Sequence, residues 1–185
     1  MGIVASGESL FRPRPRLRQA AEGASRRPPD ADPGMASPRD IARYLIMMKP
    51  LIARAIEVRQ SWIRELGMLF EEARQGNAAQ VTTRAGRLGR DHVGLFRDVR
   101  ASCERYQPPA GCEELQRAVM SWIDGLVKAC EALVEVGGSG QMVGMQVAQR
   151  NVTEARHAAR RFNNEYQRLV TELRVAVRAA RRRGP

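Results

Sequence analysis

The chain has 185 residues, of which 43% are hydrophobic and 28% charged, and a formal net charge of +11. This composition is typical of a globular protein with one core-forming domain. Its three cysteines are too few, and odd in number, for a secreted disulfide scaffold, so we expect a cytoplasmic protein. The most apolar stretch, residues 44–56, is interrupted by Lys49, Pro50 and Arg54 and predicts no membrane span.

Residues 1–36 are rich in arginine and proline and show no apolar periodicity. Such a segment cannot bury enough apolar surface to form a core, so we expect a disordered extension. Met35 stands directly before the first organised segment and is a candidate for the true start of the protein. The bundle domain is then expected over residues 37–183.

The first predicted helix covers residues 38–75. Ser37-Pro38 suits a helix N-cap and first turn, and Gly76 suits its end. Apolar residues recur along it at alternating spacings of four and three, with Arg59 the only charged member of the series. Because Pro50 leaves the phase of the series unchanged, it predicts a kink within one helix.

Three further helices are predicted by the same spacing, over residues 78–106, 111–136 and 141–183. Pro108-Pro109 separates the second from the third, and the glycine-rich run 137–140 separates the third from the fourth. Short connections make neighbouring helices antiparallel. The sequence therefore predicts an all-α, up-down-up-down four-helix bundle with left-handed, coiled-coil-like packing.

The four apolar series can be aligned across the turns. The best match places Trp62 opposite His92 and His92 opposite Trp122. The last helix fits with either Ala159 or Val152 opposite Trp122, and we prefer Ala159 because a small side chain suits a layer with two indoles. This alignment predicts a central layer of two tryptophans, one histidine and one alanine.

In the same alignment the first and last helices project beyond the other two by roughly 15 Å, at 1.5 Å per residue. Two helices alone cannot bury the apolar stripe between them, so we predict an interaction surface there. Its members are Ile41, Tyr44, Leu45, Met48, Leu173, Ala176, Val177 and Ala180. Its surroundings form a candidate anion-binding surface of Arg39, Arg43, Arg174, Arg178, Arg181, Arg182 and Arg183.

Three functions are compatible with these features. The first, which we favour, is a non-enzymatic interaction or scaffold protein that forms a homodimer or binds a partner helix through the projecting ends. The second is non-specific binding of a polyanion, either nucleic acid or an anionic membrane surface, through the arginine-rich last helix. The third is a small-ligand carrier or enzyme built around Trp62, His92 and Trp122.

Motifs for chemistry are few. A single Glu-x-x-His, at Glu154 and His157, lies off the apolar series, whereas a di-iron site needs two such motifs and two more carboxylates facing inward. No Walker loop, nucleophile elbow or paired zinc ligands occur. We therefore expect no metal, no cofactor and no enzymatic activity.

Several residues have both a structural and a functional interpretation. His92 fits a core histidine bonded to a backbone carbonyl, or a pH-sensitive group. Arg59 fits a side chain that extends its charge to solvent, or an anion ligand. Cys103 and Cys112 fit small buried hydrophobes, or a redox pair. The run 137–140 fits a flexible turn, or a phosphate cradle. In each case we favour the structural interpretation.

Overall fold

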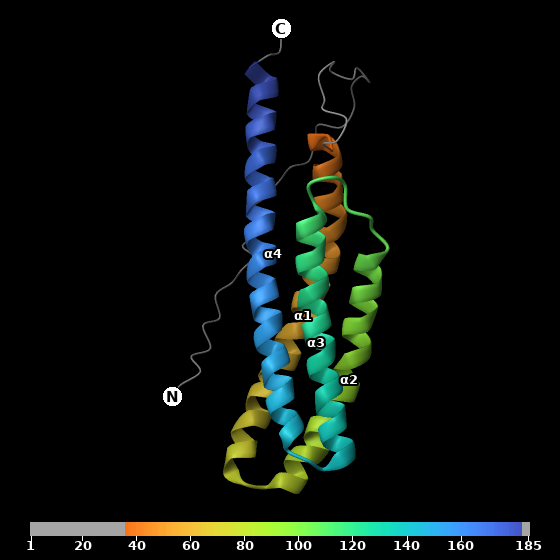
Figure 1. Cartoon of the computed structure of the whole chain (residues 1–185), viewed down its shortest axis with the longest axis vertical. Helices are drawn as coiled ribbons and strands as arrows, with labels where there is room; N and C mark the ends of the chain where they lie inside the picture. Colours follow the sequence, from red (N-terminus) through yellow and green to blue (C-terminus); the bar gives the residue numbers. More distant parts are fainter. Residues whose placement is uncertain (1–35, 183–185) are drawn as a thin grey trace. The chain divides into compact units, whose positions relative to one another are not determined.

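The computed structural model describes residues 36–182, which form four helices and no strand. The helices run up and down beside one another (Figure 1). Their bounds are α1 (Pro38–Gln75), α2 (Ala78–Glu104), α3 (Glu113–Ser139) and α4 (Val143–Arg182). The predicted all-α four-helix bundle is confirmed, and the helix ends agree with the prediction to within about one turn. The expectations for Met35 and the residues before it lie outside the described part.

The helix ends follow the residues that suit them. The Ser37 hydroxyl accepts the backbone N–H of Asp40 at 3.2 Å and donates to its carboxylate at 2.6 Å. The backbone of Gly76 has φ 93°, a left-handed conformation that glycine adopts without strain. Asn77 then caps α2 by accepting the backbone N–H of Gln80. α1 continues through Pro50, as predicted.

After His92 the apolar spacing in the sequence predicts Leu95, Val99 and Ser102 on the buried face of α2, and the structure departs from this series. Phe96 is fully buried while its neighbour Leu95 is 39% exposed, and Cys103 is buried in place of Ser102. The buried positions therefore advance by four, three and four residues. Their mean spacing lies closer to the 3.6 residues of a straight helix than to the heptad value of 3.5.

Glycine sets the distance between α3 and its two neighbours. A Cβ atom built on Gly137 would lie 2.4 Å from the Cα of Gly86, and one built on Gly125 would lie 2.9 Å from the Cβ of Ala155. The backbones of α2, α3 and α4 are thus nearly in contact. α1 packs differently: the Trp62 indole meets the Phe96 ring edge-on at 5.7 Å, and the contact of α1 with α4 is less extensive than its contact with α2.

The alignment of α3 with α4 agrees with the preferred prediction. Gly125 faces Ala155, one turn from the predicted pair of Trp122 and Ala159. The Trp122 indole also stacks on Phe162 at 6.5 Å between ring centroids. The alternative alignment, with Val152 opposite Trp122, is therefore excluded.

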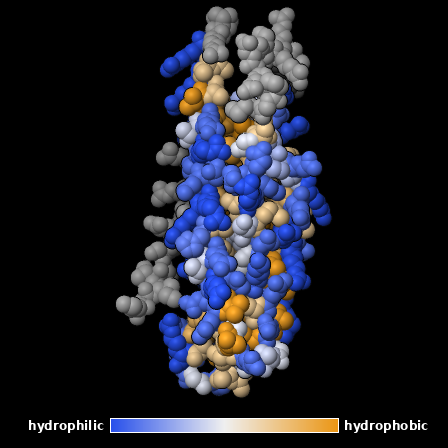
Figure 2. Space-filling model, viewed as in Figure 1, coloured by the Kyte–Doolittle hydropathy of each residue, from blue (hydrophilic) through white to orange (hydrophobic). Residues whose placement is uncertain are grey.

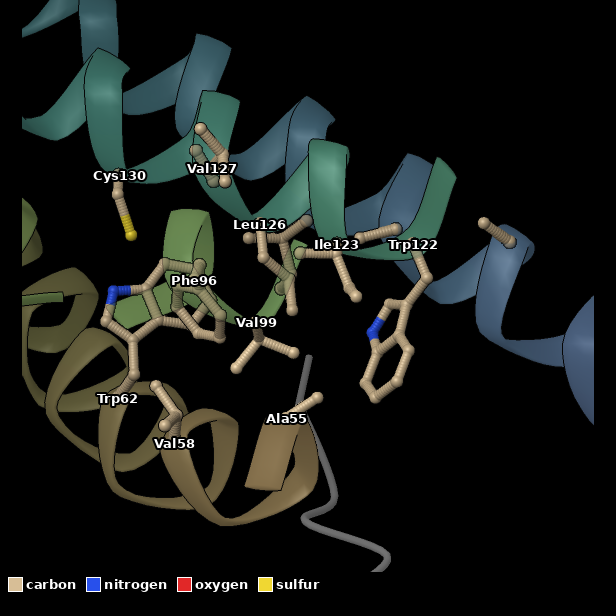
Figure 3. Packing of buried hydrophobic residues seen from close by; sticks show 14 of the residues in the cluster. Ala55, Val58, Trp62, Phe96, Val99, Trp122, Ile123, Leu126, Val127 and Cys130 are labelled. Atoms are coloured by element: carbon tan, nitrogen blue, oxygen red, sulfur yellow. The ribbon is translucent and has the colours of Figure 1, made fainter. Parts of the chain in front are cut away.

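The predicted alignment of α2 with α3 is wrong by about two turns. Arg100 forms an ion pair with Asp124, whereas the prediction placed Asp124 well away from it. The cause is that a heptad pattern repeats, so a shift by a whole repeat preserves every apolar match. The predicted central layer consequently does not form. Figure 3 shows the indoles of Trp62 and Trp122 on separate sides of Val99.

Candidate interaction surface at one end of the bundle

The residues of the predicted interaction surface divide into three groups. Tyr44, Leu45 and Met48 are buried, and Tyr44 is only 1% exposed. Three residues, Ile41, Leu173 and Ala176, are half-buried, and Val177 and Ala180 are exposed. The prediction that all eight form an open surface is therefore wrong for the first group.

The shifted position of α3 explains the burial of Tyr44. The first turn of α3 and the connection before it reach the part of α1 that was predicted to project. The Tyr44 hydroxyl donates to Oε1 of Gln116 at 2.5 Å, and Nε2 of Gln116 donates to the carbonyl oxygen of Cys103 at 2.9 Å. One glutamine of α3 thereby connects the beginning of α1 with the end of α2.

The last turns of α4 are the part of the predicted surface that the bundle leaves uncovered. Leu169 is the last buried residue of α4, yet apolar residues continue beyond it at helical spacing. Figure 1 shows these turns extending past the connection between α2 and α3, at the end of the bundle where α1 begins. The exposed fraction rises along the stripe and reaches 50% at Val177.

Three exposed apolar residues at this end were missed by the sequence analysis. Ile46 is 71% exposed, and Met47 and Val175 are also exposed. They lie off the core-facing series, at positions where the sequence pattern predicts exposure. Their apolar side chains at those positions could have identified them as part of an interaction surface. Figure 2 shows apolar atoms near both ends of the visible face. We call the following set the open end: Ile41, Ile46, Met47, Leu173, Val175, Ala176, Val177 and Ala180.

The charge around the open end is positive and unbalanced. The predicted arginines within the described part are all exposed, and none of them forms an ion pair there. They are Arg39, Arg43, Arg174, Arg178, Arg181 and Arg182; Arg183 lies outside the described residues. The nearby acids are engaged, because Asp40 is bound by Ser37 and Glu172 by Arg168 at 2.8 Å.

Elsewhere in the bundle, several arginines pair with acids of a neighbouring helix. Arg84 of α2 pairs with Glu72 of α1, and Arg97 of α2 pairs with Glu131 of α3. The open end therefore differs from these two interfaces: its arginines pair with no acid of the described part, and no other helix covers its apolar stripe.

His92 has the environment of a structural histidine. It is buried, and its Nδ1 lies 3.1 Å from the carbonyl oxygen of Leu88, one turn earlier in α2. Since a carbonyl only accepts, Nδ1 carries the proton. Trp62 and Trp122 do not flank it together, which removes the geometry on which a ligand site at this layer depended. The Trp62 Nε1 is buried without a hydrogen-bond partner among the described residues.

Arg59 is half-buried on the core-facing side of α1. Burial lowers the pKa of its guanidinium, and the nearby charge of Arg156 lowers it further. No acid of the described part forms an ion pair with either arginine. Arg59 is thus a desolvated cation beside a second cation.

The cysteines are buried free thiols. Burial raises the pKa of Cys103 and Cys112 to about 11 and that of Cys130 to about 12. A neighbouring carboxylate adds to the shift at Cys112 and Cys130. At neutral pH these thiols are protonated and shielded, which is unfavourable for nucleophilic or redox chemistry.

Three further features of the described part concern chemistry: metal ligands, the Glu-x-x-His and one surface cleft. No group of three histidine, cysteine or acidic side chains is placed to hold a metal ion, and Glu154 and His157 are both exposed on α4. A shallow cleft of about 180 Å³ lies between α3 and α4. It is lined by Glu114, Arg117, Ala118, Ser121, Arg161, Asn164 and Glu165.

None of the four helices is long and apolar enough to cross a membrane. Comparison of the chain with known protein families, curated proteins and solved structures finds no match.

Proposed function

We propose that the protein is a non-enzymatic scaffold that docks a helix of a partner protein on its open end. One observation carries the proposal: the apolar stripe of α4 continues past Leu169, where the bundle no longer covers it. Its members recur at spacings of three and four, as on a helix that packs against another helix. The three free thiols fit a reducing, cytoplasmic location, which we include in the proposal.

A helix suits this surface better than a loop or a strand. Up to its final turn, this part of α4 offers one narrow apolar stripe and no free backbone groups, because a helix interior satisfies its own N–H and C=O groups. A partner helix that lies along the stripe buries its own apolar side chains against Leu173 and Val177. Burial of one valine or leucine side chain contributes about 1.5–3 kcal/mol, so a few such contacts support reversible docking.

The experiment compares two double variants of the full chain with the wild type. Leu173→Ser/Val177→Ser removes apolar surface at the open end, and Val143→Ser/Val147→Ser makes the matched change at the other end of α4. Val143 and Val147 are exposed and lie at the same spacing on the same helix. The probe is a fluorescent, uncharged amphipathic peptide of three heptads with leucine at the a and d positions.

We expect the peptide to bind the wild type and the control variant, and the open-end variant to bind at least tenfold more weakly. Helix content by circular dichroism should be the same in all three. Equal affinity of the two variants would contradict the proposal. Light scattering on the same samples determines whether a second copy of the chain occupies the surface, which would appear as a dimer that the open-end variant abolishes.

A further inference from the structure

We propose that the partner helix is acidic: an amphipathic helix whose apolar stripe is flanked by glutamate or aspartate. The inference rests on the proposed function, because it names the chemistry of the segment that docks at the open end. Its basis is the arrangement of unpaired arginines beside the apolar stripe.

The arginines of α4 follow the stripe in register. Arg174, Arg178 and Arg181 each come one residue after a stripe member, and they recur at spacings of four and three. Consecutive residues of a helix are separated by about 100° around its axis, so these arginines form a row alongside the apolar stripe. In paired helices, the positions that flank the apolar seam select the partner through their charges.

In the body of the bundle, three arginines form ion pairs with acids of a neighbouring helix. Where α2 packs on a neighbouring helix, Arg84, Arg97 and Arg100 each pair with an acid across the interface. At the open end the arginines flank an apolar seam in the same way, but the nearby acids of the described part, Asp40 and Glu172, are already engaged. Carboxylates of the docked helix complete these pairs.

A second copy of the chain fits this surface poorly. Two open ends in contact would bring two sets of unpaired arginines together. Asp40 and Glu172 are already bound within each copy. Like charges at close range oppose association and select against that partner.

A nucleic acid or another flexible polyanion also fits poorly, because it has nothing to place on the apolar stripe. Proteins that bind single strands use exposed aromatic side chains beside their cations. The aromatic residue in the first turns of α1, Tyr44, is buried and hydrogen-bonded to Gln116.

The expected preference is moderate. A single exposed ion pair contributes little, so the row of arginines acts through several pairs at once. Three or four pairs give about a tenfold to hundredfold preference for an acidic helix over a neutral one. Added salt should reduce this preference strongly, because the pairs are solvent-exposed.

The test uses the full chain and three peptides with the same leucine stripe and with glutamate, glutamine or lysine at the flanking positions. Fluorescence polarisation measures the three dissociation constants at low salt and at about 0.5 M salt. We expect the glutamate peptide to bind at least tenfold more tightly than the glutamine peptide, and the lysine peptide to bind most weakly. In high salt the first two should converge.

Two variants with the same net charge locate the effect. Arg174→Gln/Arg178→Gln should weaken only the glutamate peptide. Arg54→Gln/Arg150→Gln changes two exposed, unpaired arginines elsewhere and should leave all affinities unchanged. An equal loss in both variants would show that net charge, and not this surface, selects the acidic peptide, and would overturn the inference.

The remaining outcomes separate the inference from the proposed function. If the glutamate and glutamine peptides bind equally and both need Leu173 and Val177, the docking of a helix is supported and the preference for an acidic helix is refuted. If no peptide binds, the proposed function is refuted. If poly-glutamate or duplex DNA binds as tightly as the glutamate peptide and is insensitive to Leu173→Ser/Val177→Ser, the surface is a polyanion site and the inference is overturned.

Discussion

Gly89 lies where the backbone of α3 passes close to α2. A Cβ atom at this position would lie 2.5 Å from the carbonyl oxygen of Cys130 and 2.9 Å from the backbone nitrogen of Val134. Backbone atoms cannot move aside by a rotamer change, so Gly89→Ala must push the two helices apart. Gly94, on the same helix, is exposed, and a Cβ atom added there would meet no atom within 4 Å, which makes Gly94→Ala the matched control.

Two opposing effects determine the size of the change. Alanine in a helix interior is more favourable than glycine by about 0.5–1 kcal/mol. At Gly94 this gain acts alone, so the free energy of unfolding should rise by about that amount. At Gly89 it is opposed by overpacking of about 1–3 kcal/mol. The upper part of that range applies because the colliding atoms belong to the backbone, so we expect a net loss of about 2 kcal/mol.

Urea unfolding followed by circular dichroism measures both variants. The Gly89→Ala midpoint should fall and the Gly94→Ala midpoint should rise, with unchanged slopes. In a thermal melt, a loss of about 2 kcal/mol lowers the midpoint by roughly 4–8 °C for a domain of this size. If Gly89→Ala is as stable as Gly94→Ala, α2 and α3 are not in near contact and the reasoning is refuted.

Three further outcomes follow from individual side chains. Arg59→Met should raise the free energy of unfolding by about 1 kcal/mol, because it removes a desolvated cation and keeps an unbranched side chain. A lower thermal midpoint would show that Arg59 has a favourable partner. Tyr44→Phe should lower the free energy of unfolding by about 1 kcal/mol, because the Gln116 carbonyl oxygen loses its donor. Urea unfolding measures this change, and an unchanged midpoint would mean that the hydrogen bond contributes nothing. Burial raises the pKa of the three thiols, that of Cys130 to about 12. The folded chain therefore keeps protons that the unfolded chain loses above pH about 8.5, and stability should fall from there toward pH about 11. Denaturation midpoints at neutral and alkaline pH test this, and Cys130→Ala should show a smaller fall.

Local signals in the sequence were sufficient for the fold class. Ser37 and Gly76 marked helix ends because the side chain of the first and the backbone freedom of the second meet needs that exist only there. The apolar spacing of α1 gave its buried face, and Pro50 was correctly placed inside the helix because the phase of the series continued across it.

The relative positions of the helices were harder to predict. A heptad series matches its partner equally well after a shift by one repeat, so it could not distinguish the true position of α3. Gly137 was assigned to a turn, although it lies in the last turn of α3 against Gly86. The spacing of Gly86 and Gly89 within a predicted helix was the available signal for this close approach.

The error in the position of α3 affected the candidate site. Because Tyr44, Leu45 and Met48 are buried, the first of them against Gln116 of α3, the open surface is smaller than predicted and lies mainly on α4. Val177 and Ala180 lie beyond Leu169, the last buried residue of α4, and are exposed. The role of this surface as a docking site stays a prediction.

The two kinds of packing in this bundle respond differently to sequence change over evolution. Where α3 meets α2 and α4, the distance is set by the main chain, and no exchange of side chains can shorten it. α1 instead rests on rings such as those of Trp62 and Phe96, whose replacement by smaller or larger groups moves the whole helix. Diverging descendants of this chain should therefore keep the geometry of α2, α3 and α4, while the position of α1 changes. Ile46 and Met47 lie on α1 and move with it. The part of the open end on α1 is thus free to vary, while the part on α4 keeps its position.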